Sequence, residues 1–500
     1  PGDLYNSGTL TVSNSAHVFY IGGSWTNTIP GVYTHGNGKV VFNGSSTGNT
    51  IKSSGSHFYN LEISGTGGWT LQSELYADNN LTISNGSLTC GAYNLTTENF
   101  VQSGGVFNAP SGTMYITPTN YSAPKPYYAF NRTGGTFNHN NGTVAFITNN
   151  CNYYLRAGDA TFYNVLFNRT TKDAGGAGLP VITIDGDFTV AGDLTAKNQY
   201  VWRYEIVAID SPTITVEGDL IFPATPNYLG NIYFGSPETL NNFTVELVGD
   251  MYILDPNVSM YANLVLIGPS NQNVRVQQGR ILASNWSIHK DTGTVYLTSK
   301  LVMLSSGTAT SSLTIVSGSL NVGTQNLIVS GSITQEGGTM TTTTGTVTAG
   351  SLIQSGGTFN AGAGTVTLAA TPQATGSFTQ TGGTFNAGAS TLNIAGNFDR
   401  GTGTSAFNAS LSTVNFNNAS VVSHILGETT FFNLQSTTAG KELQFESTKT
   451  QVILNTLLLT GSPSNLLKLR STTPGSNAFL QTDNADLTDV DSEDVIINPL

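Results

Sequence analysis

The chain has 500 residues, of which 38% are apolar and only 10% are charged, and its 30 acidic residues outnumber its 18 Lys and Arg residues to give a net charge of −12. This balance argues against partners such as nucleic acid or an anionic lipid surface, because both require clustered basic groups. No stretch approaches the roughly 20 apolar residues of a membrane helix, so we expect no membrane insertion of this segment.

The first 175 residues consist of short strand-like runs that are separated by turn signals. Apolar residues alternate with Thr, Ser or Asn, as in Leu10-Thr11-Val12 and Leu81-Thr82-Ile83, and this period of two is typical of β-strands. Asn-Gly pairs, which favour turns with a positive φ, occur at residues 37–38, 85–86 and 141–142. Almost no segment has the apolar period of a helix, so the sequence predicts an all-β protein.

A cluster of Pro and Tyr residues interrupts this pattern near residues 118–128. We predict a loop that leaves the stacked strands and contacts a partner or a neighbouring subunit. Its contact residues would be Tyr121, Tyr127 and Tyr128. An insertion whose aromatic rings lie flat on the surface is the simpler alternative.

A phrase with fixed internal spacing recurs within residues 1–175 and again within residues 301–400. A Gly-Gly pair is followed two residues later by Phe or Met, and then by the Gly or Ser that opens the next apolar run. The copies begin at Gly104, Gly134, Gly337, Gly356 and Gly382. Such self-similarity indicates a stacked-repeat architecture, in which each unit buries its apolar face on its neighbours.

A strand that ends in Gln precedes four of these phrases. The distance is 19 residues from Gln335 to Gln354 and 26 residues from Gln354 to Gln380. A sandwich domain needs about 100 residues, whereas these spacings fit one coil of a parallel β-helix. We therefore predict a β-solenoid with about 20–25 residues per rung, and the expected hand is right.

In such a coil, equivalent side chains of successive rungs lie above one another, so amides form ladders and aromatic rings fill the interior. The Gly-Gly pair turns the corner where a Cβ would obstruct the backbone. The predicted ladder residues are Gln102, Gln335, Gln354, Gln380, Phe107, Phe137, Phe359 and Phe385. A row of ligand-binding amides is the functional alternative for the four Gln residues.

The section 176–300 is less regular and contains several Gly-Asp pairs. Polysaccharide lyases and hydrolases also use the β-helix, and their sites require convergent carboxylates, often with Lys or Arg. The candidates are Asp185, Asp187, Asp193, Asp219 and Asp250. Most of them stand alone in turns, where Asp satisfies the backbone, and none has a basic neighbour in the sequence. We therefore predict no enzyme.

The section 401–500 ends in an acidic cluster. Calcium requires several oxygen ligands, and this segment supplies them without matching an EF-hand or a Gly-rich nonapeptide repeat. The candidate ligands are Asp486, Asp489, Asp491, Glu493 and Asp494. A solvated acidic loop is the alternative, and we predict no other cofactor. Cys90 and Cys151 either pair or form two buried thiols, and their spacing leaves both open.

Several segments resemble a known group of proteins. The strings GKVVFNG, FYNLEIS, NLTISNGSLTCGAYNLTT and GGTFNAGAGTVTL are similar to those of repeat-rich bacterial secreted and surface β-solenoid proteins, namely filamentous-haemagglutinin-like adhesins and autotransporter passenger-like β-helices. The resemblance covers most of residues 1–175 and 300–480 and is weaker over 180–300. It implies an extracellular structural or adhesive role and carries no catalytic residue.

These observations predict four sections, 1–175, 176–300, 301–400 and 401–500, of an extracellular structural protein. The expected role is a rod in a cell-surface fibre, filament, sheath or adhesin stalk, which self-associates and belongs to a longer mature polypeptide. An adhesin that binds glycans or a host surface is the alternative, and other surface proteins are further candidate partners. A polysaccharide lyase or hydrolase is the lesser alternative.

Overall fold

The computed structural model describes residues 2–119, 126–148, 151–170, 179–200, 202–225, 230–236, 243–277, 280–307, 309–401 and 405–500. These residues form strands, turns and bends without a helix, and therefore include no helix that could span a membrane. The chain divides into two compact units, Pro1–Ala262 and Asn263–Leu500. This boundary falls inside the predicted section 176–300, and the finer division into four sections stays a prediction.

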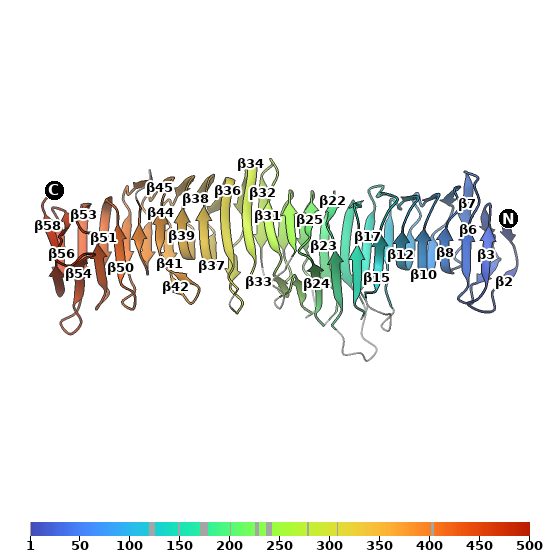
Figure 1. Cartoon of the computed structure of the whole chain (residues 1–500), viewed down its shortest axis with the longest axis horizontal. Coiled ribbons are helices and arrows are strands. Elements are labelled where there is room, and N and C mark those ends of the chain that lie inside the picture. Colours follow the sequence, from blue (N-terminus) through green and yellow to red (C-terminus); the bar gives the residue numbers. More distant parts are fainter. Residues whose placement is uncertain are drawn as a thin grey trace. The chain divides into compact units, whose positions relative to one another are not determined.

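The predicted β-solenoid is confirmed. Parallel strands joined by turns wind into stacked coils, with about 20 turns and about 23 residues per rung. In Figure 1 the strands of each unit lie side by side in chain order. The hand of the coil stays a prediction.

The strands of the first unit are β1 (Leu4–Asn6), β2 (Thr9–Thr11), β3 (Val18–Ile21), β4 (Trp25–Asn27), β5 (Val32–Thr34), β6 (Lys39–Phe42), β7 (Asn49–Lys52), β8 (Phe58–Ile63), β9 (Gly68–Leu71), β10 (Leu75–Ile83), β11 (Ser87–Thr89), β12 (Leu95–Gln102), β13 (Val106–Asn108), β14 (Thr113–Ile116), β15 (Tyr128–Arg132), β16 (Thr136–Asn138), β17 (Thr143–Thr148), β18 (Tyr153–Arg156), β19 (Thr161–Phe162), β20 (Asn164–Arg169), β21 (Val181–Asp185), β22 (Phe188–Val190), β23 (Leu194–Asn198), β24 (Tyr204–Ile209), β25 (Thr213–Val216), β26 (Leu220–Phe222), β27 (Ile232–Phe234), β28 (Thr244–Leu247), β29 (Met251–Ile253) and β30 (Val258–Met260).

The strands of the second unit are β31 (Asn263–Leu266), β32 (Gln272–Val276), β33 (Arg280–Leu282), β34 (Asn285–Leu297), β35 (Leu301–Leu304), β36 (Ser312–Gly323), β37 (Asn326–Gln335), β38 (Thr339–Thr342), β39 (Thr346–Gln354), β40 (Thr358–Asn360), β41 (Thr365–Leu368), β42 (Ala370–Thr371), β43 (Ala374–Thr375), β44 (Phe378–Gln380), β45 (Thr384–Asn386), β46 (Thr391–Ile394), β47 (Phe398–Asp399), β48 (Ala406–Asn408), β49 (Thr413–Phe416), β50 (Ser423–Leu426), β51 (Thr429–Ser436), β52 (Glu442–Phe445), β53 (Thr450–Thr460), β54 (Leu467–Ser471), β55 (Ala478–Gln481), β56 (Ala485–Thr488), β57 (Val490–Glu493) and β58 (Val495–Asn498).

The interior of the first unit contains a packed group of aromatic rings. Phe107 on β13 pairs in register with Phe137 on β16, and their ring centroids are 5.6 Å apart. Phe100 and Phe130, which are in register on β12 and β15, complete the group at 4.8 Å from Phe107 and 6.0 Å from Phe137, respectively. Burial of each such side chain stabilises the fold by about 1.5–3 kcal/mol.

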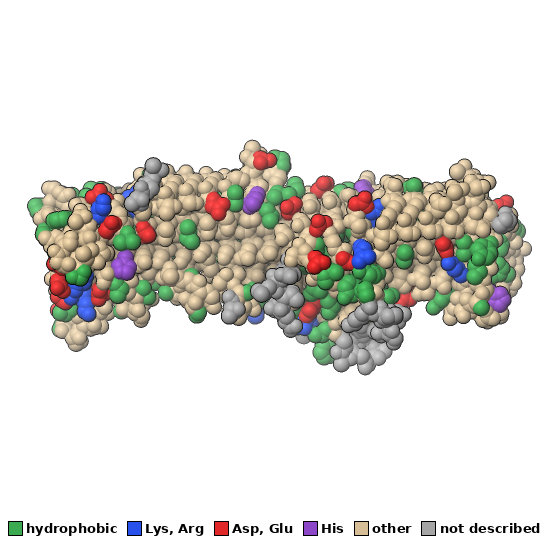
Figure 2. Space-filling model, viewed as in Figure 1, with side chains coloured by type: hydrophobic (Ala, Val, Ile, Leu, Met, Phe, Trp, Pro, Cys, Tyr) green, Lys and Arg blue, Asp and Glu red, His purple; other side chains and the backbone are tan. Residues whose placement is uncertain are grey.

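The second unit repeats this arrangement on other strands. Phe359, Phe385 and Phe407 are in register on β40, β45 and β48, with consecutive centroids 4.9 Å and 5.6 Å apart. Thr365 and Thr367 on β41 face outward, whereas the apolar residues between and after them are buried. This alternation follows from the pleat of a strand. Tan atoms, which are uncharged polar side chains and backbone, cover much of the face of this unit that Figure 2 draws.

The unequal spacing of the Gln residues has a local cause. Leu352 on β39 pairs with Phe378 on β44, and the chain between these coils makes the antiparallel hairpin of β42 and β43. The hairpin lies in the stretch between Leu368 and Phe378, which is longer by seven residues than the equivalent stretch from Ala349 to Leu352. The insertion therefore leaves the register of the coil unchanged.

The two cysteines do not pair. Cys90 and Cys151 are both free and buried, as the thiol alternative requires. Burial raises the pKa of the Cys151 thiol to about 12 and raises the pKa of Cys90 further. Both side chains therefore act as small apolar residues at neutral pH.

Candidate functional site

A column of glutamines runs through the interior of the second unit. Gln335, Gln354 and Gln380 are in register on β37, β39 and β44, and all three are buried. Gln354 Nε2 donates to Gln335 Oε1 at 3.3 Å, and Gln380 Nε2 donates to Gln354 Oε1 at 3.0 Å. Because these amides lie inside the coil, they have no access to an external ligand.

Each of these amides also reaches the backbone of the following coil. The Nε2 atoms of Gln335 and Gln354 donate to the carbonyls of Thr358 and Thr384 at 2.9 Å and 3.0 Å, respectively. In the first unit, Gln102 Nε2 donates in the same way to the carbonyl of Thr136 at 2.9 Å. The column therefore adds a side-chain hydrogen bond to carbonyls that already belong to the ladders between coils, and it gives each buried amide a partner.

A second amide column lies on the outer face of the second unit. Asn386 Nδ2 donates to Asn360 Oδ1, and Asn408 Nδ2 donates to Asn386 Oδ1, both at 2.7 Å. These residues occupy the same strands as the aromatic column but point the other way. One strand thus holds a polar ladder outside and an apolar ladder inside.

The structure ties two of the three predicted contact tyrosines to the coil. Tyr128 lies in β15, and its hydroxyl donates to Asp185 Oδ2 at 2.6 Å. The Tyr127 hydroxyl donates to Glu98 Oε1 at 3.2 Å, and burial is the main reason why the pKa of Tyr127 is raised. Tyr121 lies outside the described residues. A partner contact at these residues stays a prediction.

Asp185 has different surroundings from the other candidate catalytic carboxylates. Asp185 forms an ion pair with Arg156, whose Nε and Nη2 lie 2.9 Å and 2.6 Å from Oδ2, and Arg156 also packs over the Tyr128 ring. No residue near Asp185 in the sequence indicates this basic partner, because Arg156 lies one coil away. The Arg156 side chain is 38% exposed, and such a pair contributes about 0–1 kcal/mol.

The other aspartates cap turns. Asp193 Oδ1 accepts the backbone N–H of Asp219 at 2.9 Å, and Asp219 Oδ1 accepts that of Asp250 at 2.8 Å. Asp187 Oδ1 accepts the N–H of Thr213 at 2.7 Å. Burial, followed by the neighbouring carboxylates, raises the pKa of Asp219. These contacts match the role of a turn Asp that satisfies the backbone.

The acidic residues near the C-terminal end are spread over several elements. Arg470 Nη2 lies 2.5 Å from Asp491 Oδ2, and Arg470 Nε lies 3.5 Å from Glu493 Oε2. Asp494 Oδ2 accepts the N–H of Gly475 at 2.6 Å, while Asp486 lies on β56 and Asp489 in the following turn. Within the described ranges, no three acidic, His or Cys side chains are grouped to hold a metal ion. Calcium binding stays a prediction.

The second unit also contains a cleft of about 480 Å³ between β48 and β51. β48 pairs with β45, but among the described strands it forms no ladder with β51. A turn separates β48 from β49, whereas β51 continues past a bulge at Phe431 and Asn433. The backbone therefore follows a different path in the two coils here. The cleft is lined by Arg400, Ala406, Phe407, Asn408, Glu428, Thr429, Thr430, Thr450 and Val452.

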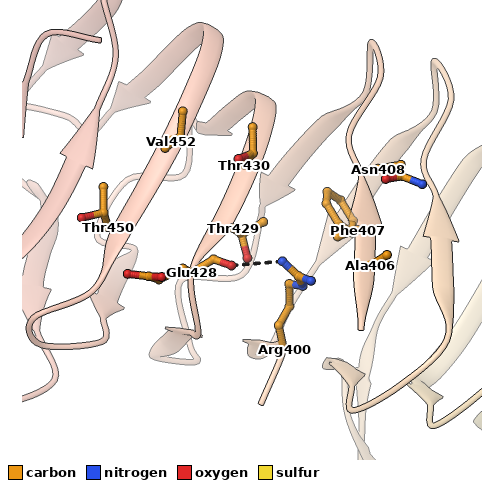
Figure 3. Close-up of a pocket in the computed structure, with 9 residues that line it drawn as sticks. All are labelled: Arg400, Ala406, Phe407, Asn408, Glu428, Thr429, Thr430, Thr450 and Val452. Carbon is orange, nitrogen blue, oxygen red and sulfur yellow. Dashed lines mark hydrogen bonds between the residues drawn. The ribbon is translucent and has the colours of Figure 1, made fainter. Parts of the chain in front are cut away.

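Arg400 stands between the two strands of this cleft (Figure 3). Its Nη1 donates to the carbonyl of Glu428 at 3.0 Å, and its Nη2 donates to the carbonyl of Ser405 at 2.6 Å. Burial lowers the pKa of Arg400. Thr429 is buried, and its Oγ1 has no hydrogen-bond partner among the described residues.

Sequence reasoning missed this cleft, although one signal for it was present. Phe398 pairs with Phe378, so Arg400 takes the position in the coil that follows Gln380. An Arg at the end of the Gln column can be identified by alignment of Phe378-Thr379-Gln380 with Phe398-Asp399-Arg400. No sequence pattern indicates the gap between the strands, because the gap depends on how the backbone paths of two consecutive coils differ.

Comparisons with known protein families, with curated proteins and with solved structures found no match to this chain.

Proposed function

We propose that this chain is an extracellular structural protein, a β-solenoid section of a cell-surface fibre, filament, sheath or adhesin stalk. The observation that carries the proposal is the continuity of the interior columns. Gln354 hydrogen-bonds with the coils on both sides of its own, and the rings of Phe359, Phe385 and Phe407 contact one another in succession along the same direction. Each coil is thereby held by its neighbours, which gives stiffness along the axis of a unit.

The surface composition supports the same role. Only 10% of residues are charged, and the outward positions of β41 and β45 carry Thr and Asn. Such a surface offers few sites for trypsin-like cleavage, which suits a protein outside the cell. The proposal assigns no catalytic residue.

The test is electron microscopy of the purified chain over a concentration series, together with sedimentation velocity. We expect elongated particles that join into longer assemblies as the concentration rises. Isolated particles of constant mass at every concentration would contradict self-association. Cell-surface immunolabelling of the source organism tests the location, and label confined to the cell interior would refute the extracellular role.

A glycan-binding adhesin is the second candidate, and exposed aromatic side chains favour it. Tyr5, Tyr20 and Trp202 are 71%, 60% and 56% exposed, respectively, and such rings stack on sugars. A glycan array tests this alternative with the wild-type chain and with the Tyr20→Ala variant. Retention of a glycan that Tyr20→Ala abolishes would support adhesion, and an array without any bound glycan would oppose it.

A further inference from the structure

The outer face of the second unit has a hollow over β51 and β53, with a volume of about 260 Å³. None of its lining residues belongs to the cleft at Arg400. They point away from the interior, because the residues that alternate with them, such as Leu434 and Leu457, are buried. The hollow is lined by Asn433, Gln435, Asn455, Thr456 and Leu458.

A bulge in the ladder between β51 and β53 borders the hollow. Phe431 pairs with Ile453, whereas Asn433 pairs with Thr456, so two residues of β53 lie opposite one residue of β51. The exposed Asn455 is one of the two, and its Nδ2 donates to Asn433 Oδ1 at 2.7 Å. Bulges of this kind change the direction of a side chain and are frequent beside functional sites.

The hollow contains both donors and acceptors that no described residue uses. The Gln435 carboxamide makes no hydrogen bond with a described residue, so its N–H groups and its oxygen are all available. Asn455 bonds through Nδ2, which leaves its Oδ1 available within the described part of the chain. Thr456 Oγ1 accepts two hydrogen bonds, and its O–H can still donate.

This mixture of groups indicates the chemistry of the ligand. A metal cation requires acceptors, and an anion requires donors or a positive charge, whereas a ligand hydroxyl both donates and accepts. Among the described residues, no charged side chain lines the hollow. Asp486 pairs in register with Leu458 in the following coil, and its carboxylate opposes an anionic ligand. The hollow therefore suits a neutral ligand that is rich in hydroxyl groups.

Leu458 adds an apolar contact to these polar groups. In the three preceding coils its column contains Asn393, Asn415 and Gln435, so an apolar residue is the exception there. A pyranose ring has hydroxyls around its edge and C–H groups on its faces, and it therefore needs both kinds of contact. The volume of about 260 Å³ is below the roughly 300–1,000 Å³ of pockets for drug-sized ligands, which limits the occupant to about one ring.

We propose that this hollow binds one neutral pyranose unit. The carboxamides of Gln435 and Asn455 bond to its hydroxyls, and Leu458 contacts a C–H face of the ring. This site goes beyond the structural role, and it does not involve Tyr20, which tests the glycan-binding alternative above.

The test is saturation-transfer difference NMR of the full chain with methyl β-D-glucopyranoside, methyl β-D-galactopyranoside and methyl α-D-mannopyranoside. We expect saturation transfer to at least one of them, with a Kd on the order of 1 mM because the contacts are few. Methyl β-D-glucuronide should bind more weakly than the glucoside because of Asp486. Methyl β-lactoside binds as tightly as the galactoside if the unit is the end of a glycan, and more weakly if it is a free sugar.

Two variants place the sugar in the hollow. Gln435→Leu removes an amide that bonds to no described residue, and the loss of its hydrogen bonds to the sugar should weaken binding about threefold to tenfold. Leu458→Glu removes the apolar contact and fills the hollow with a longer charged side chain, so it should abolish the transfer. Thr367→Leu, which lies in the same column outside the hollow, is the matched control and should leave binding unchanged. Equal urea midpoints verify that all three variants fold.

Several results would contradict the proposal. The absence of transfer to all three methyl glycosides rejects it, and so does glycerol binding as tightly as the glycosides, because the ring would then be irrelevant. Unchanged binding by Gln435→Leu and Leu458→Glu places the sugar elsewhere. If Tyr20→Ala alone abolishes binding, the glycan-binding alternative stands and the hollow is refuted.

Discussion

Gln354 shows how a single side chain connects three coils. Its amide contacts Gln335 in the preceding coil, and it contacts both Gln380 and the backbone of Thr384 in the following coil. A buried residue that bonds to several polar groups is hard to replace, because its loss removes a hydrogen bond from each of them. The stability of the column therefore rests on the amide and not on the volume of the side chain.

We expect Gln354→Leu to lower the free energy of unfolding of the second unit by about 1–3 kcal/mol, because the buried Gln335 Oε1 loses the Gln354 donor. Urea unfolding followed by circular dichroism measures the effect. Thr367→Ala, on the outer face of β41, is the control and should change stability by less than about 0.5 kcal/mol. Similar midpoints for the two variants would show that the ladder contributes little.

Lys441 is a buried cation whose effect on stability depends on pH. Its Nζ donates to the carbonyl of Val421 and to Ser423 Oγ, the latter at 2.6 Å. Burial lowers the pKa of Lys441 from its ordinary value of 10.5 to about 8. Between these two pH values the unfolded chain binds more protons than the folded chain. The contribution of Lys441 to the free energy of unfolding therefore increases as the pH rises.

The comparison of the wild type with Lys441→Met isolates this effect from other groups that titrate in the same range. We expect the wild type to gain stability relative to the variant as the pH rises from 8 to 10, with a slope of at most about 1.4 kcal/mol per pH unit. Below pH 8 the difference should be constant. Urea unfolding at several pH values provides the measurement, and parallel curves for the two proteins would contradict the expected titration.

At the scale of the element, the Gly-Gly corner is the most constrained part of a coil. The second Gly of each pair has a positive φ, which is +67° at Gly357 and +68° at Gly383. A Cβ on Gly383 would also lie 2.5 Å from the carbonyl oxygen of Gly356 in the preceding coil. Backbone conformation and close stacking therefore both require glycine there.

Gly383→Ala should lower the free energy of unfolding by at least about 3 kcal/mol, because it adds a steric clash to the left-handed strain of about 1–2 kcal/mol. Gly475→Ala is a matched control, because Gly475 has a φ of +78° and nothing within 4 Å of the added Cβ. It should lose only the strain contribution. Equal losses for the two variants would show that stacking does not restrict the corner.

The repeated phrase predicted the coil because its spacing indicates which residues lie above one another in the interior. Each residue type of the phrase occupies one fixed place in the rung, as the Gly-Gly pair, Phe385 and Gln380 show. The spacing of the repeats in the sequence therefore equals the spacing of paired residues in neighbouring coils. The section 176–300 was harder to interpret because its coils use different corners, such as the turn at Asp219. The ion pair of Arg156 with Asp185 joins residues 29 apart, and no local pattern identifies such a partner.

At the scale of the whole molecule, each coil contacts chiefly its neighbours, so stability is approximately a sum over coils and their interfaces. Gln335 and Gln354 occupy equivalent positions 19 residues apart. Deletion of residues 336–354 joins equivalent points and removes one coil. The second unit should then fold with a melting temperature within a few degrees of that of the wild type.

Deletion of residues 336–344 tests the same idea by breaking the register. It shifts inward-facing residues of β39 out of the column that Leu327 and Val347 share, so we expect loss of cooperative unfolding by circular dichroism. If both deletions fold equally well, the coils are not interchangeable units held by register. If neither folds, the contacts between coils are not approximately additive.

The outer amide column has a chemical consequence over long times. Asparagine deamidates when the backbone nitrogen of the following residue attacks the side-chain amide, which requires both groups to be free to approach each other. In the second unit the amide of Asn386 is held between Asn360 and Asn408, and the N–H of Ala387 is bonded to the carbonyl of Asn408. The stacked arrangement therefore protects an asparagine-rich surface from the ageing reaction to which its composition would otherwise expose it.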